Sequence, residues 1–286
     1  MVSFFRGIAS VPGSPFRGMT DPVAKALLPT PLSLGLSAVE AAPVLIPVMR
    51  LLSLGLVDHV SLRTAAIDDE LGRALARGAR QLVVLGAGLD SRAYRMQVLD
   101  GVRVFEVDHP ATQADKIRHL RGQKARAADV RFLAVDFERD SLDAELARGG
   151  HDTEAPTAWI WEGVTPYLHR TAIESTLSVA SARSAAASTM MVTYVEPELV
   201  SVPHVPLSIL RAGFLALGEP IRCAMTSLET RVLFGDHGFD VVSDTGSEDW
   251  ARRFLVGERS VVGIRERLAV AVRGEREPRS VRRRSA

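Results

Sequence analysis

Residues 81–95 constrain the fold of this chain more than any other stretch. Their apolar run ends at Leu85, the chain turns through Gly86-Ala87-Gly88, and a helix-compatible segment follows. This pattern predicts a buried strand that turns through glycines into a helix. Glycine has no Cβ, so the backbone amides of such a turn can approach a bound nucleotide-like ligand. The glycine turn, residues 86–88, therefore predicts a ligand site without specifying the ligand.

Strand-like and helix-like segments alternate along most of the chain. After the first strand, the strand-like segments are residues 102–107, 130–135, 157–161, 190–195, 239–243 and 260–264, and the helical ones are 62–79, 112–121, 141–148, 173–187 and 228–237. Strands that alternate with helices predict parallel βαβ units in an open, twisted sheet. We therefore expect an α/β fold built on a Rossmann-like sheet of seven strands.

Three regions flank or interrupt this alternating core, which we place at residues 62–272. Residues 1–61 are expected to form an N-terminal arm and a helical cap. The alternation stops at a proline-rich stretch, which predicts an insertion after the fifth strand, over about residues 197–227, that folds over the sheet. Residues 273–286 are rich in arginine and almost free of apolar side chains, so we expect a basic disordered tail.

The N-terminal region has two parts of different character. Residues 1–18 are rich in Gly, Pro and Ser and predict a loose arm, and Asp21-Pro22 predicts the start of a helix. Residues 31–57 are strongly apolar and long enough to invite a membrane interpretation, but charged residues and prolines interrupt them. We expect two short amphipathic helices that cover a pocket rather than a transmembrane span, with peripheral membrane contact left open.

Composition narrows the classes of partner and the cellular location. The formal net charge of +1 gives no global field that would attract nucleic acid. Cys223 is the only cysteine, which rules out an intrachain disulfide, and the first residues lack the features of a signal peptide, so we expect a cytoplasmic protein. The seven histidines are scattered, and we expect no metal site. The oligomeric state has no signal in the sequence.

Carboxylates follow the next three predicted strands. Asp108 ends the second strand, about twenty residues after the glycine turn, where an acid can accept hydrogen bonds from ribose hydroxyls. Asp136-Phe137 follows the third strand and suits an adenine amino group and ring face, and Glu162 follows the fourth. The alternatives are that Asp108 caps the next helix and that Asp136 is a solvated turn residue. Because parallel strands end at one edge of a sheet, we expect these groups to share a site.

The pattern favours S-adenosyl-L-methionine over a dinucleotide. Ser91 stands where a dinucleotide fingerprint has its third glycine. S-adenosyl-L-methionine contains a ribose, an adenine and a zwitterionic amino acid but no phosphate, which matches acids at successive strand ends. Arg63, at the start of the helix before the first strand, is the candidate partner for the amino acid carboxylate.

Four segments of the chain resemble the leucine carboxyl methyltransferase family, which includes protein phosphatase methyltransferases and bacterial polyketide O-methyltransferases. They occur in order, with suitable spacing, and read Arg-Thr-Ala-Ala-Ile-Asp from Arg63, Leu-Gly-Ala-Gly-Leu-Asp-Ser-Arg from Leu85, Phe-Glu-Val-Asp-His-Pro from Phe105 and Glu-Gly-Val-Thr-Pro-Tyr-Leu from Glu162. The likeness runs from about residue 21 to 264 and implies the class I methyltransferase fold, with S-adenosyl-L-methionine as the cofactor.

The resemblance also implies a role for each candidate site residue. It assigns the cofactor carboxylate to Arg63, the methionine moiety to Gly86 and Gly88, the ribose to Asp108, the adenine to Asp136 and Phe137, and the amino acid end to Glu162. Phe137 departs from the leucine usual in the family but can still cover an adenine face. All seven are therefore expected to bind cofactor.

The chemistry of the acceptor stays open at this level. A carboxylate acceptor is already ionised and needs no general base, whereas a phenol or alcohol does; His109, Tyr167, His169 and Tyr194 are candidates, and we assign none. Apolar walls at residues 32–57 and 200–217 predict a small hydrophobic acceptor, polyketide- or lipid-like, rather than a protein terminus. The alternatives are a cofactor-binding module without turnover and an NAD-dependent oxidoreductase.

Overall fold

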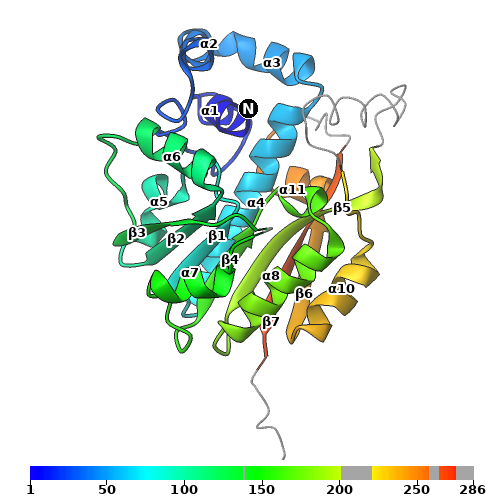
Figure 1. Ribbon diagram of the computed structural model, residues 1–286. Helices are drawn as coiled ribbons and strands as arrows, with labels where there is room; N and C mark the ends of the chain where they lie inside the picture. The colour runs from blue at the N-terminus through cyan, green and yellow to red at the C-terminus, as the bar shows by residue number, and fades with distance from the viewer. Residues whose placement is uncertain (138, 201–220, 258–263, 275–286) are drawn as a thin grey trace, which may run out of the picture.

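A seven-stranded sheet forms the centre of the computed structural model, which describes residues 1–137, 139–200, 221–257 and 264–274 (Figure 1). The order of the strands is β3-β2-β1-β4-β5-β7-β6. They span Gln81–Leu85 (β1), Arg103–Asp108 (β2), Asp129–Ala134 (β3), Thr157–Trp161 (β4), Thr189–Val200 (β5), Phe239–Gly246 (β6) and Ile264–Arg273 (β7). The predicted α/β, Rossmann-like sheet of seven strands is confirmed, and β7 runs antiparallel to both of its neighbours, β5 and β6.

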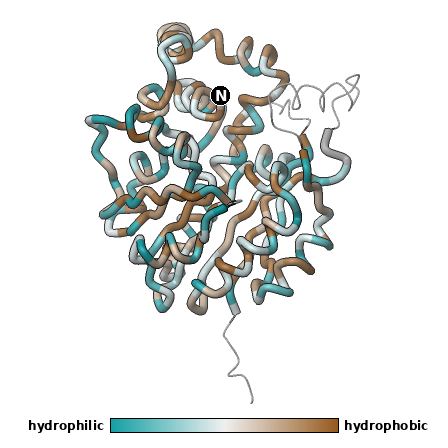
Figure 2. The backbone as a smooth tube through the Cα atoms, viewed as in Figure 1, coloured by the Kyte–Doolittle hydropathy of each residue, from teal (hydrophilic) through white to brown (hydrophobic). Residues whose placement is uncertain are grey.

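Helices cover both faces of the sheet, which explains why its central strands are continuous apolar runs. Successive side chains of a strand point to opposite faces. Leu82 and Val84 therefore join the core under α4 and α11, and Val83 and Leu85 join the core under α7, α8 and α10. The helices after the cap are α4 (Leu56–Ala76), α5 (Arg92–Arg95), α6 (Pro110–His119), α7 (Leu142–Arg148), α8 (Arg170–Ala182), α10 (Ser227–Asp236) and α11 (Ser247–Phe254). Figure 2 shows the apolar strands at the centre of the molecule.

The last strand lies further along the chain than the sequence suggested. A strand was expected at residues 260–264, but β7 begins at Ile264, and residues 260–263 lie outside the described part. An apolar run from Leu268 to Ala271 is fully buried between β5 and β6, so it forms the strand. The segment assigned to the tail therefore begins with the last residue of β7, and residues 275–286 lie outside the described part.

The N-terminal arm was predicted to be loose, and this prediction was wrong. Residues 2–9 form α1 (Val2–Ala9), because Phe4, Phe5 and Ile8 share one helix face and are buried against α2 and α4. No helix starts at Asp21-Pro22 either; residues 22–27 form turns. The Asp21 carboxylate is buried in an ion pair with Arg6 instead of capping a helix.

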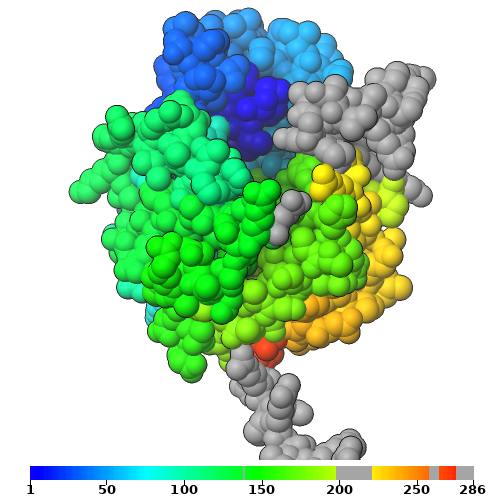
Figure 3. Space-filling view, in the orientation of Figure 1, coloured from blue at the N-terminus to red at the C-terminus, as the bar shows by residue number. Residues whose placement is uncertain are grey.

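The helical cap consists of α2 (Thr30–Ala41), a short 3-10 turn, η1 (Pro43–Leu45), and α3 (Ile46–Leu52). The predicted boundary between residues 61 and 62 falls inside α4, which begins at Leu56. None of the helices in the described ranges has by itself the length and apolar character of a membrane span; α2 and the segment 43–52 have them jointly but meet at 109°. The space-filling view shows this blue N-terminal segment at one end of the molecule (Figure 3). The predicted insertion lies mostly at residues 201–220, outside the described part.

Candidate functional site

The glycine turn leaves β1 with its backbone in the left-handed region. Gly86 has a φ of +67° and Gly88 a φ of +45°, which side chains with a Cβ rarely adopt. A Cβ on Gly86 would also collide with the side chain of Val164. The amides of Gly86 and Ala87 donate hydrogen bonds to the carbonyl oxygen of Val107 at 2.8 and 3.0 Å. The turn is therefore fixed to β2 and closely covered by the segment after β4.

A cleft of about 200 Å³ opens at this turn. Its walls are the glycine turn and Leu89-Asp90, the segment 162–164 after β4, Arg63 of α4, and Val2 and Arg6 of α1. Four of the predicted site residues, Arg63, Gly86, Gly88 and Glu162, line this cleft. Arg6 was not anticipated, because α1 was expected to be unstructured.

Asp108 lies directly beside the cleft. The amide of Gly88 donates a hydrogen bond to its Oδ2, and the amide of His109 donates to its Oδ1 at 2.6 Å. The helix that follows is capped by His109, whose Nδ1 accepts a hydrogen bond from the amide of Ala111 at 3.3 Å. The alternative that Asp108 is only a helix cap is therefore wrong.

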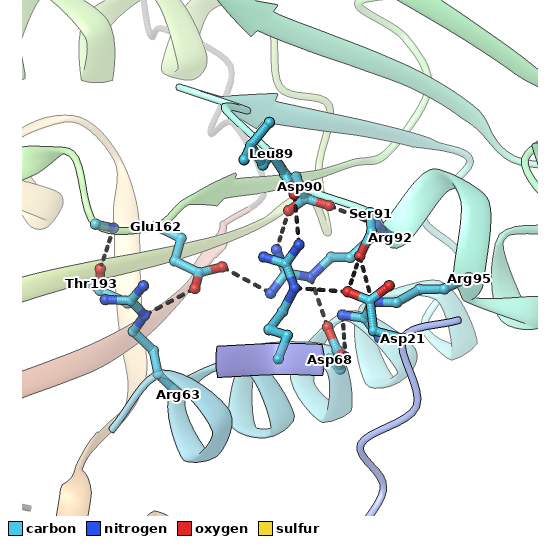
Figure 4. Close-up of polar contacts among 12 residues, drawn as sticks. Asp21, Arg63, Asp68, Leu89, Asp90, Ser91, Arg92, Arg95, Glu162 and Thr193 are labelled. Carbon is cyan, nitrogen blue, oxygen red and sulfur yellow. Dashed lines mark hydrogen bonds and ion pairs between the residues drawn. The ribbon is translucent and has the colours of Figure 1, made fainter. Parts of the chain in front are cut away.

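Arg63, which is buried, and Glu162, which is partly buried, form an ion pair in the wall of the cleft (Figure 4). The Nε of Arg63 donates to Oε1 of Glu162 at 2.9 Å, and the Nη2 of Arg92 donates to Oε2 at 2.8 Å. Burial disfavours the ionised form of Glu162, but Arg92 and Arg63 outweigh it and lower the pKa of this carboxyl below its usual value. Glu162 is thus charged at neutral pH, with both oxygens paired.

Arg92 connects this pair to further carboxylates that the sequence analysis missed. Its Nε donates to Asp68 at 2.7 Å, and its Nη1 pairs with Asp90. Burial raises the pKa of Asp90, but Arg92 and other cations more than offset this and hold it well below the usual value. Buried charges persist in a protein interior only when they are paired in this way. A signal was present, because Asp90 and Arg92 follow the glycine turn directly and belong to the family-like motif.

Asp136 and Phe137 lie one strand further along the sheet edge and do not line the cleft. The Asp136 carboxylate is 3.7 Å from the Nε of Arg139, and its side chain is 28% exposed. Phe137 is half-buried against the core under α7. The structure therefore brings five of the seven predicted residues together and leaves these two beside them, where their role in binding adenine stays a prediction.

None of the four candidate general bases lines the cleft formed by the described residues. His109 caps α6, and the Nε2 of His169 lies 3.3 Å from Arg222. Tyr194 is buried, donates a hydrogen bond to Asp244 at 2.8 Å, and has its pKa raised to about 12, first by burial. Tyr167 ends the short 3-10 helix η3 (Thr165–Tyr167). No base is assigned.

Within the described ranges, no group of three or more His, Cys, Asp or Glu side chains could hold a metal ion.

Comparison with known proteins adds a family and a fold. The model of a family described as leucine carboxyl methyltransferase matches residues 15–181. A Streptomyces coelicolor protein, provisionally named an S-adenosyl-L-methionine-dependent methyltransferase, is 46% identical over 135 residues, 47% of this chain and 47% of that protein. One from Mycolicibacterium gilvum with the same provisional name is 35% identical over 187 residues, 65% of this chain and 54% of that protein. The chain therefore matches about half the length of these curated relatives.

Two crystal structures share the architecture over nearly the whole chain. A DUF574 family protein from Streptomyces avermitilis superposes with a TM-score of 0.61 at 15% identity, covering 94% of this chain and 96% of that one. A protein from Thermobifida fusca, provisionally described as a methyltransferase, gives a TM-score of 0.55 at 17% identity, covering 96% and 94%. At such identities the likeness concerns the fold.

Proposed function

The chain belongs to the leucine carboxyl methyltransferase family, and on this basis we propose that it transfers the methyl group of S-adenosyl-L-methionine to an oxygen of a small apolar acceptor. The observation that carries the proposal is the Arg63–Glu162 pair in the wall of the cleft. A buried cation beside a partly buried anion is complementary to a zwitterionic amino acid, which is the methionine end of the cofactor. Arg63 would bind its carboxylate and Glu162 its ammonium group.

The residues around the glycine turn also fit the rest of this cofactor. Asp108 presents its carboxylate beside Gly88, where no Cβ obstructs a ligand, and it can accept hydrogen bonds from ribose hydroxyls. A dinucleotide would instead bring a pyrophosphate to the turn. The amide of Gly88, which such a pyrophosphate would need as a donor, already donates to the Asp108 carboxylate. The donor set therefore argues against the NAD-dependent oxidoreductase that was kept as an alternative.

The chain's own groups would act by binding and orientation. The bound cofactor supplies a methyl group on a cationic sulfur, which an acceptor oxygen attacks in line. Arg63 and Glu162 would hold the amino acid end of the cofactor and Asp108 its ribose, and such positioning would lower the barrier to displacement. Val2 and Arg6 of α1 form a wall that keeps water from the methionine end. Asp90 and Glu162 remain ionised at neutral pH, because the arginines around them lower the pKa of each carboxyl.

A carboxylate is the acceptor group we favour, and an apolar body is what should carry it. No candidate base lines the cleft in the described residues, and a carboxylate acceptor needs none. The cap offers an apolar approach: Val44 and Leu52 are 78% and 72% exposed, while Arg50, the only charged residue of α3, is turned inward to Asp58. The acceptor's other predicted wall, residues 200–217, lies almost wholly outside the described part.

Two measurements test this function. Calorimetric titration with S-adenosyl-L-methionine, its demethylated product and NAD should show binding of the first two only. Mass spectrometry of a panel of apolar acids, phenols and alcohols should then show the gain of one methylene group on the acids. Binding of NAD alone would refute the cofactor assignment. Cofactor binding without turnover on any acceptor would favour the binding module that was the other alternative.

A further inference from the structure

The antiparallel strand β7 brings a second carboxylate to Arg63. Because β7 runs against the other strands, its first residues lie at the edge where β4 and β5 end. Glu266 pairs there with Val195 of β5, and it is only 4% exposed. Its Oε2 accepts a hydrogen bond from the Nη1 of Arg63 at 2.8 Å. Arg63 therefore contacts one carboxylate from the end of β4 and another from the beginning of β7.

His59 holds this second carboxylate from the same helix. His59 and Arg63 are four residues apart on α4, so their side chains share one face. The Nε2 of His59 lies 2.5 Å from the same Oε2 of Glu266. The imidazole is itself buried beside the ring of Trp250, with 6.3 Å between ring centroids. Burial disfavours ionised Glu266, but Arg63 and His59 outweigh it and hold its pKa well below the usual value.

The two carboxylates together fix the plane of the Arg63 guanidinium group. Glu162 binds its Nε and Glu266 binds its Nη1, and a guanidinium group is rigid and planar. Gly163, with a φ of +67°, leaves room on one side: a Cβ there would lie 3.5 Å from both Nη1 and Nη2. Among the described residues, Arg63 donates only through Nε and Nη1, so its Nη2 can bind a ligand in the cleft, which Arg63 lines and Glu266 does not.

We propose that Glu266, held by His59, is a positioning residue that orients Arg63 to bind the carboxylate of the cofactor's amino acid end. The proposal rests on the proposed function. Glu266 acts through Arg63 and does not touch the cofactor. Its negative charge opposes a second anion at Arg63, so the proposal requires that the gain from orientation exceed this repulsion.

The test compares two ligands in one protein sample. S-adenosyl-L-methionine carries the carboxylate, and its decarboxylated analogue lacks it. The wild-type protein should bind S-adenosyl-L-methionine at least about tenfold more tightly than the analogue, which corresponds to about 1.4 kcal/mol. Glu266→Ala should reduce this ratio to within about threefold. Glu266→Gln keeps an oxygen that can accept from Arg63, so it should retain most of the wild-type ratio.

Controls separate orientation from stability. The control concerns Arg267, which follows Glu266 on β7 and points to the other face of the sheet. Asp244→Ala removes the ion-pair partner of Arg267 and should leave the ratio of the two affinities unchanged. A partly unfolded sample lowers both affinities equally, so the ratio survives modest destabilisation. If Glu266→Ala does not fold, Glu266→Leu, which fills the space without oxygens, replaces it.

Three outcomes would overturn the proposal: an unchanged ratio in Glu266→Ala, tighter binding of S-adenosyl-L-methionine by this variant, or equal binding of both ligands by the wild type. Failure of the wild type to bind either ligand would refute the proposed function instead.

Discussion

The amide of Gly88 donates a hydrogen bond to the carboxylate of Asp108, which joins the turn after β1 to the end of β2. One contact thereby serves two purposes. It holds the glycine turn in a left-handed conformation, and it places a carboxylate beside the cleft, where we propose that the ribose of the cofactor binds. Binding of the cofactor and the shape of the turn should therefore depend on the same side chain.

Replacing Asp108 should abolish most of the affinity for S-adenosyl-L-methionine. Hydrogen bonds to a charged group contribute about 1.5–3 kcal/mol each, so Asp108→Ala should weaken binding by at least about tenfold. Calorimetric titration measures this directly. Asp115→Ala, an exposed aspartate on α6, is the control and should bind like the wild type. Unchanged affinity in Asp108→Ala would remove Asp108 from the site.

Gly86→Ala should destabilise the protein for two reasons. The left-handed backbone costs about 1–2 kcal/mol for a residue with a Cβ, and the new methyl group would meet Val164. Gly13→Ala isolates the first effect, because Gly13 has a φ of +87° and no atom within 4 Å of an added Cβ. Urea unfolding should therefore show a larger loss for Gly86→Ala than for Gly13→Ala. Equal losses would mean that Val164 moves aside freely.

Arg92→Ala should be strongly destabilising. Arg92 pairs with Asp68, Asp90 and Glu162, and removing one partner of a buried ion pair costs about 3–5 kcal/mol. Arg92→Lys should recover little of this, because an ammonium group cannot reach three carboxylates with planar geometry. Arg118→Ala, from an exposed pair with Asp115, should leave the free energy of unfolding almost unchanged. A loss of less than about 1 kcal/mol in Arg92→Ala would show that water hydrates the three carboxylates that lose their partner.

Stability should fall on acidification because of His151. Burial, and then the charge of Arg183, lowers the pKa of His151 from its usual 6.5 to about 4. A group whose pKa is lowered by folding stabilises the protein above the unfolded value and loses that contribution as the pH falls through the folded value. The free energy of unfolding should therefore decrease between pH 6.5 and 4, by at most about 3 kcal/mol from this residue.

The variant His151→Gln tests the assignment. It should flatten the pH dependence of the free energy of unfolding, measured by urea unfolding between pH 4 and 6.5. His151 lies between Phe105 and Trp159, at 5.5 and 5.4 Å between ring centroids, so some general loss of stability is expected at every pH. Only the slope of the free energy of unfolding against pH tests the role of His151, and an unaltered slope in His151→Gln would contradict the prediction.

The sequence predicted the parts of the site that depend on local pattern. Apolar runs identified β1 to β4 closely and the first half of β5, which continues to Val200 through the start of the predicted insertion. Because parallel strands end at one edge, Asp108 and Glu162 were placed near the glycine turn correctly. Arg63 was chosen because it stands at the start of the predicted helix 62–79; in the structure it lies inside α4, which begins at Leu56, and it lines the cleft. Such inferences need only the period of each element and one rule of topology.

The parts that were missed depend on contacts between distant residues or on short signals. Glu266 and Arg63 are 203 positions apart, and nothing in the residues around Glu266 points to α4. The helix α1 is eight residues long and precedes a Gly- and Ser-rich stretch, so its buried face of Phe4, Phe5 and Ile8 was overlooked. Its burial comes from packing against α2 and α4, which overrides the local composition.

The position of β7 between β5 and β6 has a consequence for the order of folding. The glycine turn, Asp108, Arg63 and Glu162 all leave the ribosome long before Glu266 does. Contacts between residues far apart in sequence form late, because closing a long loop costs entropy first. Arg63 should therefore acquire its second carboxylate only when the C-terminal strand enters the sheet between two earlier strands. A nascent chain that stops before residue 264 would carry the turn and both walls of the cleft, yet Glu162 alone would hold its Arg63.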